Sequence, residues 1–276
     1  MSAMYERGDI VSDTEDVFLS HLPPDTPVFQ YNPQCDLQSL MPPVSPHDCF
    51  VVIKAFPSKA LDELDEQLPG RLDYSLSLQT LILKMPCHPH EEAASRFEYL
   101  LMRLAEQMMA TRRISCLGAT RIDGEDRKKQ ADRAWSPIRQ GHRFPTVALE
   151  VEYSQTAEKL QRDIAWWLLE SKGRMRMGIT INIKRGSGNI EIKSWVPAMS
   201  FPQHASTASQ VAQRILMKRG GNGQEPTIQG GDLIIPFQYL FLNEPREGEG
   251  DFVFTQDMLL HDIAELIWAA IDEGNA

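Results

Sequence analysis

The sequence predicts an α/β fold with a mixed central sheet and flanking helices, and three observations support this. Residues 145–155 alternate apolar and polar side chains with the period of two that is typical of a strand. A helical pattern follows directly, in which Leu160, Ile164 and Leu168 lie on one side. The periodic segments around this pair occur in the order helix, three strands, helix and strand, which is typical of α/β domains.

The N-terminal part of the sequence predicts an irregular arm followed by one domain. Residues 1–48 are acidic at the start and rich in proline, which breaks regular elements, so we expect an irregular arm there. Residues 49–276 are expected to form a single α/β domain with a C-terminal strand and helix extension. This domain should begin with a strand at 50–53, a helix at 58–68 and a strand at 72–85.

The central segments follow from their apolar periodicity. A strong helix is expected over 90–112, because its apolar residues form one stripe. After it we expect a strand at 114–122, a hairpin turn at 123–126, strands at 131–139 and 145–154, a helix at 156–171, and strands at 175–183 and 190–195. The extension is expected to contain a helix at 203–218, a strand at 232–241 and a last helix from a Thr255 cap to about Ile271.

Acidic residues cluster around the strand at 145–154. Glu150 and Glu152 point to the same side of it, with Cα atoms roughly 6.5–7 Å apart. A fold keeps two such carboxylates at low cost only at a solvated surface or around a cation. With Asp132 upstream, the order of an acid, a spacer, two acids on a strand and a helix is typical of metal nucleases. The alternative is a solvated sheet edge, where the acids pair with arginines such as Arg133 and Arg176.

An ordered set of residues extends this pattern over about residues 74–270. Its members are Lys84, Met85, Pro86, His90, Glu91, Asp132, Trp135, Pro137, Pro145, Glu150, Ser154, Leu160, Asp163, Trp166 and Trp167. This set resembles the PD-(D/E)XK nuclease superfamily, and the closer likeness is to uncharacterised fungal members. The resemblance implies a mixed central sheet of the restriction-endonuclease-like type. It also implies a nuclease, a metal-dependent phosphodiester hydrolase that acts on DNA or RNA.

The resemblance implies a role for each acid. Asp132 and Glu150 would hold one Mg²⁺ or Mn²⁺, with the Val151 carbonyl as a further oxygen ligand. Such an ion polarises a phosphodiester and lowers the pKa of a bound water. Glu152 occupies the place of the usual family lysine, and would bind a second ion or accept the proton of the attacking water. Lys159 would supply the missing positive charge, unless it is an exposed helix residue.

Other polar residues are expected to contact nucleic acid or to complete the site. Lys128, Lys129, Arg133 and Gln155 are the candidates for nucleic-acid contact, and the two lysines are further substitutes for the missing family lysine. Gln155 has the alternative role of a turn residue at the helix entry. Glu91 lies early in the helix predicted over 90–112, where a carboxylate suits the helix dipole. The resemblance gives Glu91 the alternative role of a further acid of the site.

Composition limits the other classes of function. A net charge of −10 and a pI near 5.2 argue against an indiscriminate nucleic-acid binder, although basic residues gather at 112–143 and 172–185. No apolar run reaches the roughly 18–20 residues of a membrane helix. The cysteines lack C-x-x-C spacing and we find no secretory signal, so we expect reduced thiols in an intracellular protein, cytoplasmic or nuclear.

A second class of function keeps the fold without turnover. The missing lysine and the acidic net charge favour a catalytically inactive nuclease-fold protein that serves as an interaction module for a protein partner. The retained acids favour the enzyme. Zinc is not expected at Cys87, His88 and His90, because these residues lack a partner cluster. The sequence also contains no P-loop, no glycine-rich dinucleotide motif and no nucleophile elbow.

Overall fold

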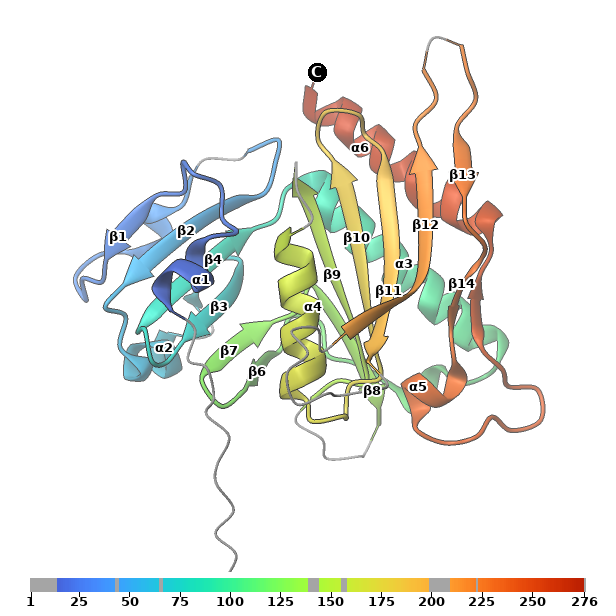
Figure 1. Ribbon diagram of the computed structural model, residues 1–276, viewed down its shortest axis with the longest axis horizontal. Helices are drawn as coiled ribbons and strands as arrows, with labels where there is room; N and C mark the ends of the chain where they lie inside the picture. Colours follow the sequence, from blue (N-terminus) through green and yellow to red (C-terminus); the bar gives the residue numbers. More distant parts are fainter. Residues whose placement is uncertain are drawn as a thin grey trace, which may run out of the picture.

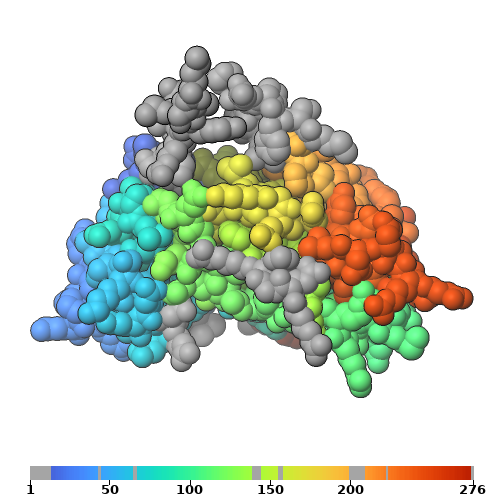
Figure 2. Space-filling view, turned by 90° about the horizontal axis from the view of Figure 1, so that it is seen from below, coloured from blue at the N-terminus to red at the C-terminus, as the bar shows by residue number. Residues whose placement is uncertain are grey.

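The computed structural model describes residues 14–42, 45–64, 67–138, 144–154, 158–198, 209–221 and 223–275. In these residues the chain forms an α/β fold with two large mixed sheets, a small two-stranded antiparallel sheet and flanking helices (Figure 1). Figure 2, which views the molecule from below, shows the N-terminal and C-terminal parts on opposite sides of a central body in green and yellow. The fold class that the sequence predicts is confirmed.

The first sheet has the strand order β1-β2-β4-β3-β7-β6. Its strands are β1 (Val28–Gln30), β2 (Cys49–Lys54), β4 (Thr80–Met85), β3 (Arg71–Ser75), β7 (Arg127–Gln130) and β6 (Arg121–Asp123). β1 and β2 are parallel, and the other neighbours are antiparallel. It is flanked by α1 (Glu15–Leu19), η1 (Leu37–Leu40) and α2 (Ser58–Leu64). The described part of the arm that we expect to be irregular thus contains α1, β1 and η1.

The second sheet has the strand order β13-β12-β11-β10-β9-β8-β5. Its strands are β13 (Thr227–Gln229), β12 (Ser209–Lys218), β11 (Ile190–Pro197), β10 (Met177–Lys184), β9 (Val147–Ser154), β8 (Arg133–Pro137) and β5 (Ile114–Cys116). β9 and β10 are parallel, and the other neighbours are antiparallel. The central sheet is therefore mixed, as the sequence predicts.

Helices cover both faces of the second sheet. α3 (His88–Gln107) and α6 (Glu265–Asn275) pack on one face, and α4 (Glu158–Glu170) packs on the other (Figure 1). The succession α3, β5, β8, β9, α4 and β10 is the helix, three strands, helix and strand that the sequence predicts. The hairpin β6–β7 is inserted between β5 and β8 and belongs to the first sheet.

Side chains of β9 point alternately to the two faces of the second sheet, and this places its acidic residues on one face. Val147, Leu149 and Val151 are fully buried in the core that contains α3. Ala148 lies on the opposite side and packs in the core that contains α4. Side chains two residues apart share a face of a strand, so the glutamates at 150 and 152 also lie on the α4 side. The strand thus presents its acids toward α4 and the first sheet.

The C-terminal elements complete the α3 side of the sheet. They are β14 (Leu233–Ile235), α5 (Phe237–Phe241), β15 (Phe252–Phe254) and the π-helical segment η4 (Met258–Ala264), which continues into α6. The short helix η3 (Thr111–Arg113) lies earlier in the chain, between α3 and β5. The backbone N–H of Met258 donates to Thr255 Oγ1 at 3.3 Å, so Thr255 caps this last helix as predicted. Among the described residues, no helix is long and apolar enough to span a bilayer.

Two of the predicted strands are interrupted. Residues 72–85 form the hairpin β3–β4, because the chain turns at 76–79 and Gln79 adopts a left-handed conformation with a φ of 47°. Residues 114–122 divide between β5 and β6, which belong to different sheets. A turn containing Gly118, with a φ of 55°, separates them. In both segments a turn without a strong sequence signal interrupts the apolar pattern.

Two predictions in the extension are wrong. The described part of the helix expected over 203–218 is strand β12, because it pairs with β11 along its length and buries Ile215 and Met217 against the sheet. Residues 232–241 are not one strand. Pro236 lacks an N–H group and ends β14, and α5 begins directly after it.

The contact between β10 and α4 has no spare space at Gly178. A Cβ atom on this residue would lie 2.7 Å and 2.8 Å from two side-chain carbons of Ile164. We expect Gly178→Ala to lower the free energy of unfolding by about 1–3 kcal/mol, because the core is overpacked. Gly186→Ala is the matched control, since a Cβ there meets nothing within 4 Å. Equal urea midpoints for the two variants would contradict the packing.

Candidate functional site

The predicted acids meet where the chain crosses from the first sheet to the second. Asp132 lies in the link between β7 of the first sheet and β8 of the second. Its Oδ2 accepts a hydrogen bond of 2.7 Å from the backbone N–H of Val151, which lies between Glu150 and Glu152. The three acids are 1%, 2% and 5% exposed. The alternative of a solvated sheet edge is therefore wrong.

An internal cation holds Asp132. The Nζ atom of Lys84, on β4, donates to Asp132 Oδ2 and to the carbonyl oxygen of Val151, each at 3.0 Å. Burial disfavours the charged form of Lys84. The carboxylates of Asp132, Glu150 and Asp48 outweigh burial and raise the pKa of this ammonium group. Lys84 is therefore a buried cation that ties the first sheet to the second.

A buried imidazole links Asp132 to another carboxylate. His90, early in α3, lies 3.1 Å from Asp132 Oδ1 through Nε2 and 2.8 Å from Asp48 Oδ2 through Nδ1. Asp48 also accepts the backbone N–H groups of Cys87 and Tyr153. Burial lowers the pKa of His90, but the two carboxylates outweigh it and raise the pKa to about 9. The ring is therefore an imidazolium at neutral pH.

The two glutamates of β9 have fewer partners. Trp167 Nε1 donates to Glu150 Oε1 at 2.7 Å, and Lys129 Nζ lies 3.8 Å from the same oxygen. Burial raises the pKa of Glu150 above its usual range, against the opposing charge of Lys129. Burial also raises the pKa of Glu152 to about 7. In the described part of the chain, Glu152 Oε2 has no hydrogen-bond partner.

The charged groups continue into α4 and the first sheet. Lys129 Nζ lies 2.9 Å from Asp163 Oδ1 and 3.3 Å from Asp73 Oδ2. Lys159 Nζ donates to Asp163 Oδ2 at 2.5 Å, and Arg127 Nε donates to Asp73 Oδ1 at 2.5 Å. We call the whole set the buried charge network, which consists of Asp48, Asp73, Lys84, His90, Arg127, Lys129, Asp132, Glu150, Glu152, Lys159 and Asp163.

Of the three lysines considered as substitutes for the family lysine, two lie in the buried charge network and one does not. Lys129 and Lys159 both join the network, and Lys159 is only 4% exposed, so its alternative role as an exposed helix residue is wrong. Lys128 alternates with Lys129 along β7. Its side chain consequently points away from the network and lies 3.1 Å from Asp62.

The remaining sequence-predicted residues lie outside the network. Glu91 pairs with Arg71 at 2.9 Å and with Arg133 at 3.4 Å. Arg71 in turn lies 4.0 Å from Asp132, so a guanidinium separates Glu91 from the buried acid. Arg133 turns toward α3, and its Nη1 donates to the backbone carbonyl of Asp132. Gln155 lies outside the described residues.

Sequence reasoning gave no role to several members of the network. Lys84, His90 and Asp163 belong to the ordered set that carries the family resemblance, so a signal for them was present. Asp48 and Asp73 carry no such signal. Asp48 lies in the segment expected to be irregular, and Asp73 lies at the start of a strand with no acid two residues away.

The helix α1 covers one side of the network. The ring of Phe18 lies over the Arg127 guanidinium at 5.1 Å, and Arg162 Nη1 donates to the carbonyl oxygen of Val17 at 2.6 Å. His21 follows in the next turn, and burial lowers its pKa to about 3. The space left in the network is a cavity of about 10 Å³, which holds about one water. It is lined in part by Lys84, Lys129, Glu150, Lys159 and Asp163.

As arranged, these residues do not fit a divalent metal ion. Asp132 Oδ2 and the Val151 carbonyl converge on one cation, but that cation is the ammonium group of Lys84. The other oxygen of Asp132 faces His90 and Arg71, which are also positively charged. In the described ranges, no group of three or more His, Cys, Asp or Glu residues is placed to hold a metal.

Comparison with known proteins adds little to this geometry. The sequence matches no protein-family model and no curated protein. Among solved structures, it is similar to the crystal structure of a presumed nuclease of the DUF820 family from Anabaena variabilis, with 13% identity and a TM-score of 0.37. The similarity covers 76% of this chain and 98% of that chain. At this identity and score, the likeness assigns neither fold nor function.

The raised pKa of Glu152 predicts a pH-dependent stability. A carboxyl with a pKa near 4.5 in the unfolded chain and about 7 in the folded protein binds more protons when folded. Its contribution to the free energy of unfolding therefore falls as pH rises from about 4.5 to about 7. We expect Glu152→Gln to become increasingly more stable than the wild type across this window, with a constant difference above it.

Urea unfolding of both proteins from pH 4.5 to 8 measures this difference. Glu225→Gln, at an exposed position, corrects for the change in net charge. A difference between Glu152→Gln and the wild type that does not vary with pH would contradict the burial of an ionisable Glu152.

Proposed function

We propose that this chain is a nuclease-like protein of the PD-(D/E)XK type that acts as a non-catalytic interaction module. One observation carries the proposal: the ammonium group of Lys84 lies 3.0 Å from both Asp132 Oδ2 and the Val151 carbonyl. These are two of the oxygens that the family resemblance assigns to the metal. The charge that a metal would supply is thus supplied by a side chain of the protein itself.

The surroundings of Lys84 oppose its replacement by an ion. Lys84 is 7% exposed. An ion that took its place beside Asp132 would therefore leave the ammonium group buried without its partner. Breaking a buried ion pair in this way costs about 3–5 kcal/mol. The neighbouring cavity of about 10 Å³ is also too small for a phosphate group. The network therefore stabilises the contact between the sheets, and partners would bind elsewhere.

The second candidate is a Mg²⁺- or Mn²⁺-dependent phosphodiesterase that acts on DNA or RNA. It is favoured by the buried Glu152 Oε2 atom, which lacks a hydrogen-bond partner among the described residues. An unsatisfied buried carboxylate oxygen is a feature that binding of a cation would relieve. For this function, Lys84 would have to leave Asp132, and the first sheet would have to move to admit a substrate.

Cleavage assays separate the two candidates. We expect purified protein to leave plasmid, single-stranded DNA and RNA uncut with Mg²⁺, with Mn²⁺ and with EDTA. Metal-dependent cleavage that disappears in Glu150→Gln would establish the enzyme and overturn our proposal. Glu158→Gln is the control for this substitution, because Glu158 is exposed at the start of α4.

Thermal melts test whether Lys84 takes the place of an ion. We expect Mn²⁺ to leave the midpoint of the wild type unchanged, because the oxygens are already bonded to the ammonium group. In Lys84→Ala the same oxygens lose their cation, so Mn²⁺ should raise the midpoint. Binding stabilises by about 2.7 kcal/mol at a hundredfold excess over Kd. A wild type that Mn²⁺ stabilises as much as the variant would contradict this role.

A further inference from the structure

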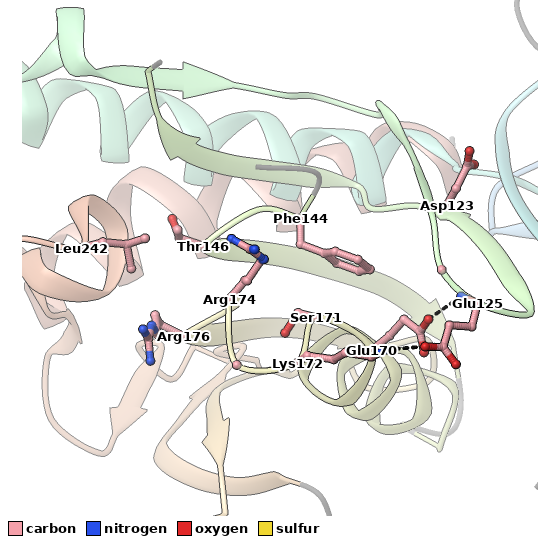
Figure 3. Close-up of a pocket in the computed structure, with 12 residues that line it drawn as sticks. Asp123, Glu125, Phe144, Thr146, Glu170, Ser171, Lys172, Arg174, Arg176 and Leu242 are labelled. Carbon is pink, nitrogen blue, oxygen red and sulfur yellow. Dashed lines mark hydrogen bonds and ion pairs between the residues drawn. The ribbon is translucent and has the colours of Figure 1, made fainter. Parts of the chain in front are cut away.

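A large open pocket lies apart from the buried charge network, at the end of the second sheet where β9 and β10 begin. It has a volume of about 740 Å³, within the roughly 300–1,000 Å³ range of small-molecule sites. The turn before β7, the C-terminal end of α4 and the loop into β10 form its walls (Figure 3). Thr146, which lines the pocket, comes directly before β9, whereas the network acids Glu150 and Glu152 lie further along that strand. The pocket and the network are therefore at different points of the strand.

The two ends of the pocket carry opposite charge. Arg174 and Arg176 lie on the side of Thr146 and Leu242, whereas Glu170 lies at the other end (Figure 3). Residues 172–185 contain no acid, and no ion pair of Arg176 occurs among the described residues. The backbone N–H of Arg176 donates to the carbonyl oxygen of Thr146 at 2.8 Å, which fixes the loop that carries both arginines.

The acidic end is also held in place. Glu170 Oε1 accepts a hydrogen bond from the backbone N–H of Glu125, in the turn that precedes β7. Lys172 pairs with the side chain of Glu125, and Glu170 lies close enough to act on the same ammonium group. No ion pair of Glu170 itself occurs among the described residues. Phe144 forms an apolar wall, and its ring is fixed by Trp166 at 6.3 Å and Trp167 at 6.5 Å.

We propose that this pocket binds a nucleotide. The guanidinium group of Arg176 suits a phosphate, which arginine binds through paired, charge-assisted hydrogen bonds, and the nearby Arg174 adds positive charge. The apolar wall at Phe144 suits the base, and the carboxylate of Glu170 suits an exocyclic amino group. The order of positive charge, apolar surface and negative charge thus matches phosphate, base and amino group. This inference is independent of whether the protein cleaves nucleic acid.

Calorimetric titration of the full-length protein tests the proposal, with AMP, UMP, inorganic phosphate and the trinucleotide ApApA as probes. We expect AMP to bind more tightly than UMP, which lacks an exocyclic amino group, and much more tightly than inorganic phosphate. If ApApA binds more tightly than AMP, the ligand is a nucleotide within a nucleic-acid strand. If the two bind with equal affinity, the ligand is a free nucleotide. In both cases we expect binding to require Arg176.

Two matched variants locate the site. Arg176→Glu should weaken AMP binding at least about tenfold, because it replaces a charge-assisted contact by a repulsive one. Arg185→Glu makes the same charge change at the exposed opposite end of β10 and should leave binding unchanged. Glu170→Gln should reduce the preference for AMP over UMP. Absence of AMP binding, equal loss in both arginine variants, or phosphate binding as tightly as AMP would overturn the proposal.

Discussion

The contact of Lys84 with Asp132 and the Val151 carbonyl is the constraint on which the rest of the structure depends. It joins β4 of the first sheet to the link that precedes β8 and to the middle of β9 in the second sheet. Taking charges out of water is costly, so such a contact persists only when each charge keeps several partners. Asp132 has His90, Lys84 and a backbone N–H, and this set holds its pKa well below the usual range.

The sequence predicted the elements whose surroundings are local or strongly patterned. β9, α4 and β10 follow from period-two and helical patterns, because their apolar faces are buried by the sheet and helices next to them. The wrong predictions concern segments whose secondary structure is determined by pairing with other strands. β12 has a helical composition, but it is held as a strand by pairing with β11. The existence of a separate first sheet was also not predicted, since it depends on β3 pairing with β7, far apart in the sequence.

For the candidate site, the sequence predicted which acids come together but not what neutralises them. Asp132 and the two glutamates of β9 share one region, as their spacing on adjacent elements requires. Their cations come from β4, α3 and β7, and only the fold of the first sheet against the second brings these within reach. The spacing of residues along the sequence does not reveal how close these cations lie to the acids in the folded chain. Lys128 and Lys129 point in opposite directions because β7 is a strand, which the sequence did not predict for these residues.

A double-mutant cycle between Lys84 and Asp132 tests most directly whether this buried ion pair holds the two sheets together. Urea unfolding would be measured for the wild type, Lys84→Met, Asp132→Asn and the double variant. Each single change leaves a buried charge without its partner, which costs about 3–5 kcal/mol. Because Lys84 and Asp132 are partners, we expect the double variant to be less destabilised than the sum of the single changes by at least about 2 kcal/mol. Additivity within about 0.5 kcal/mol would contradict it.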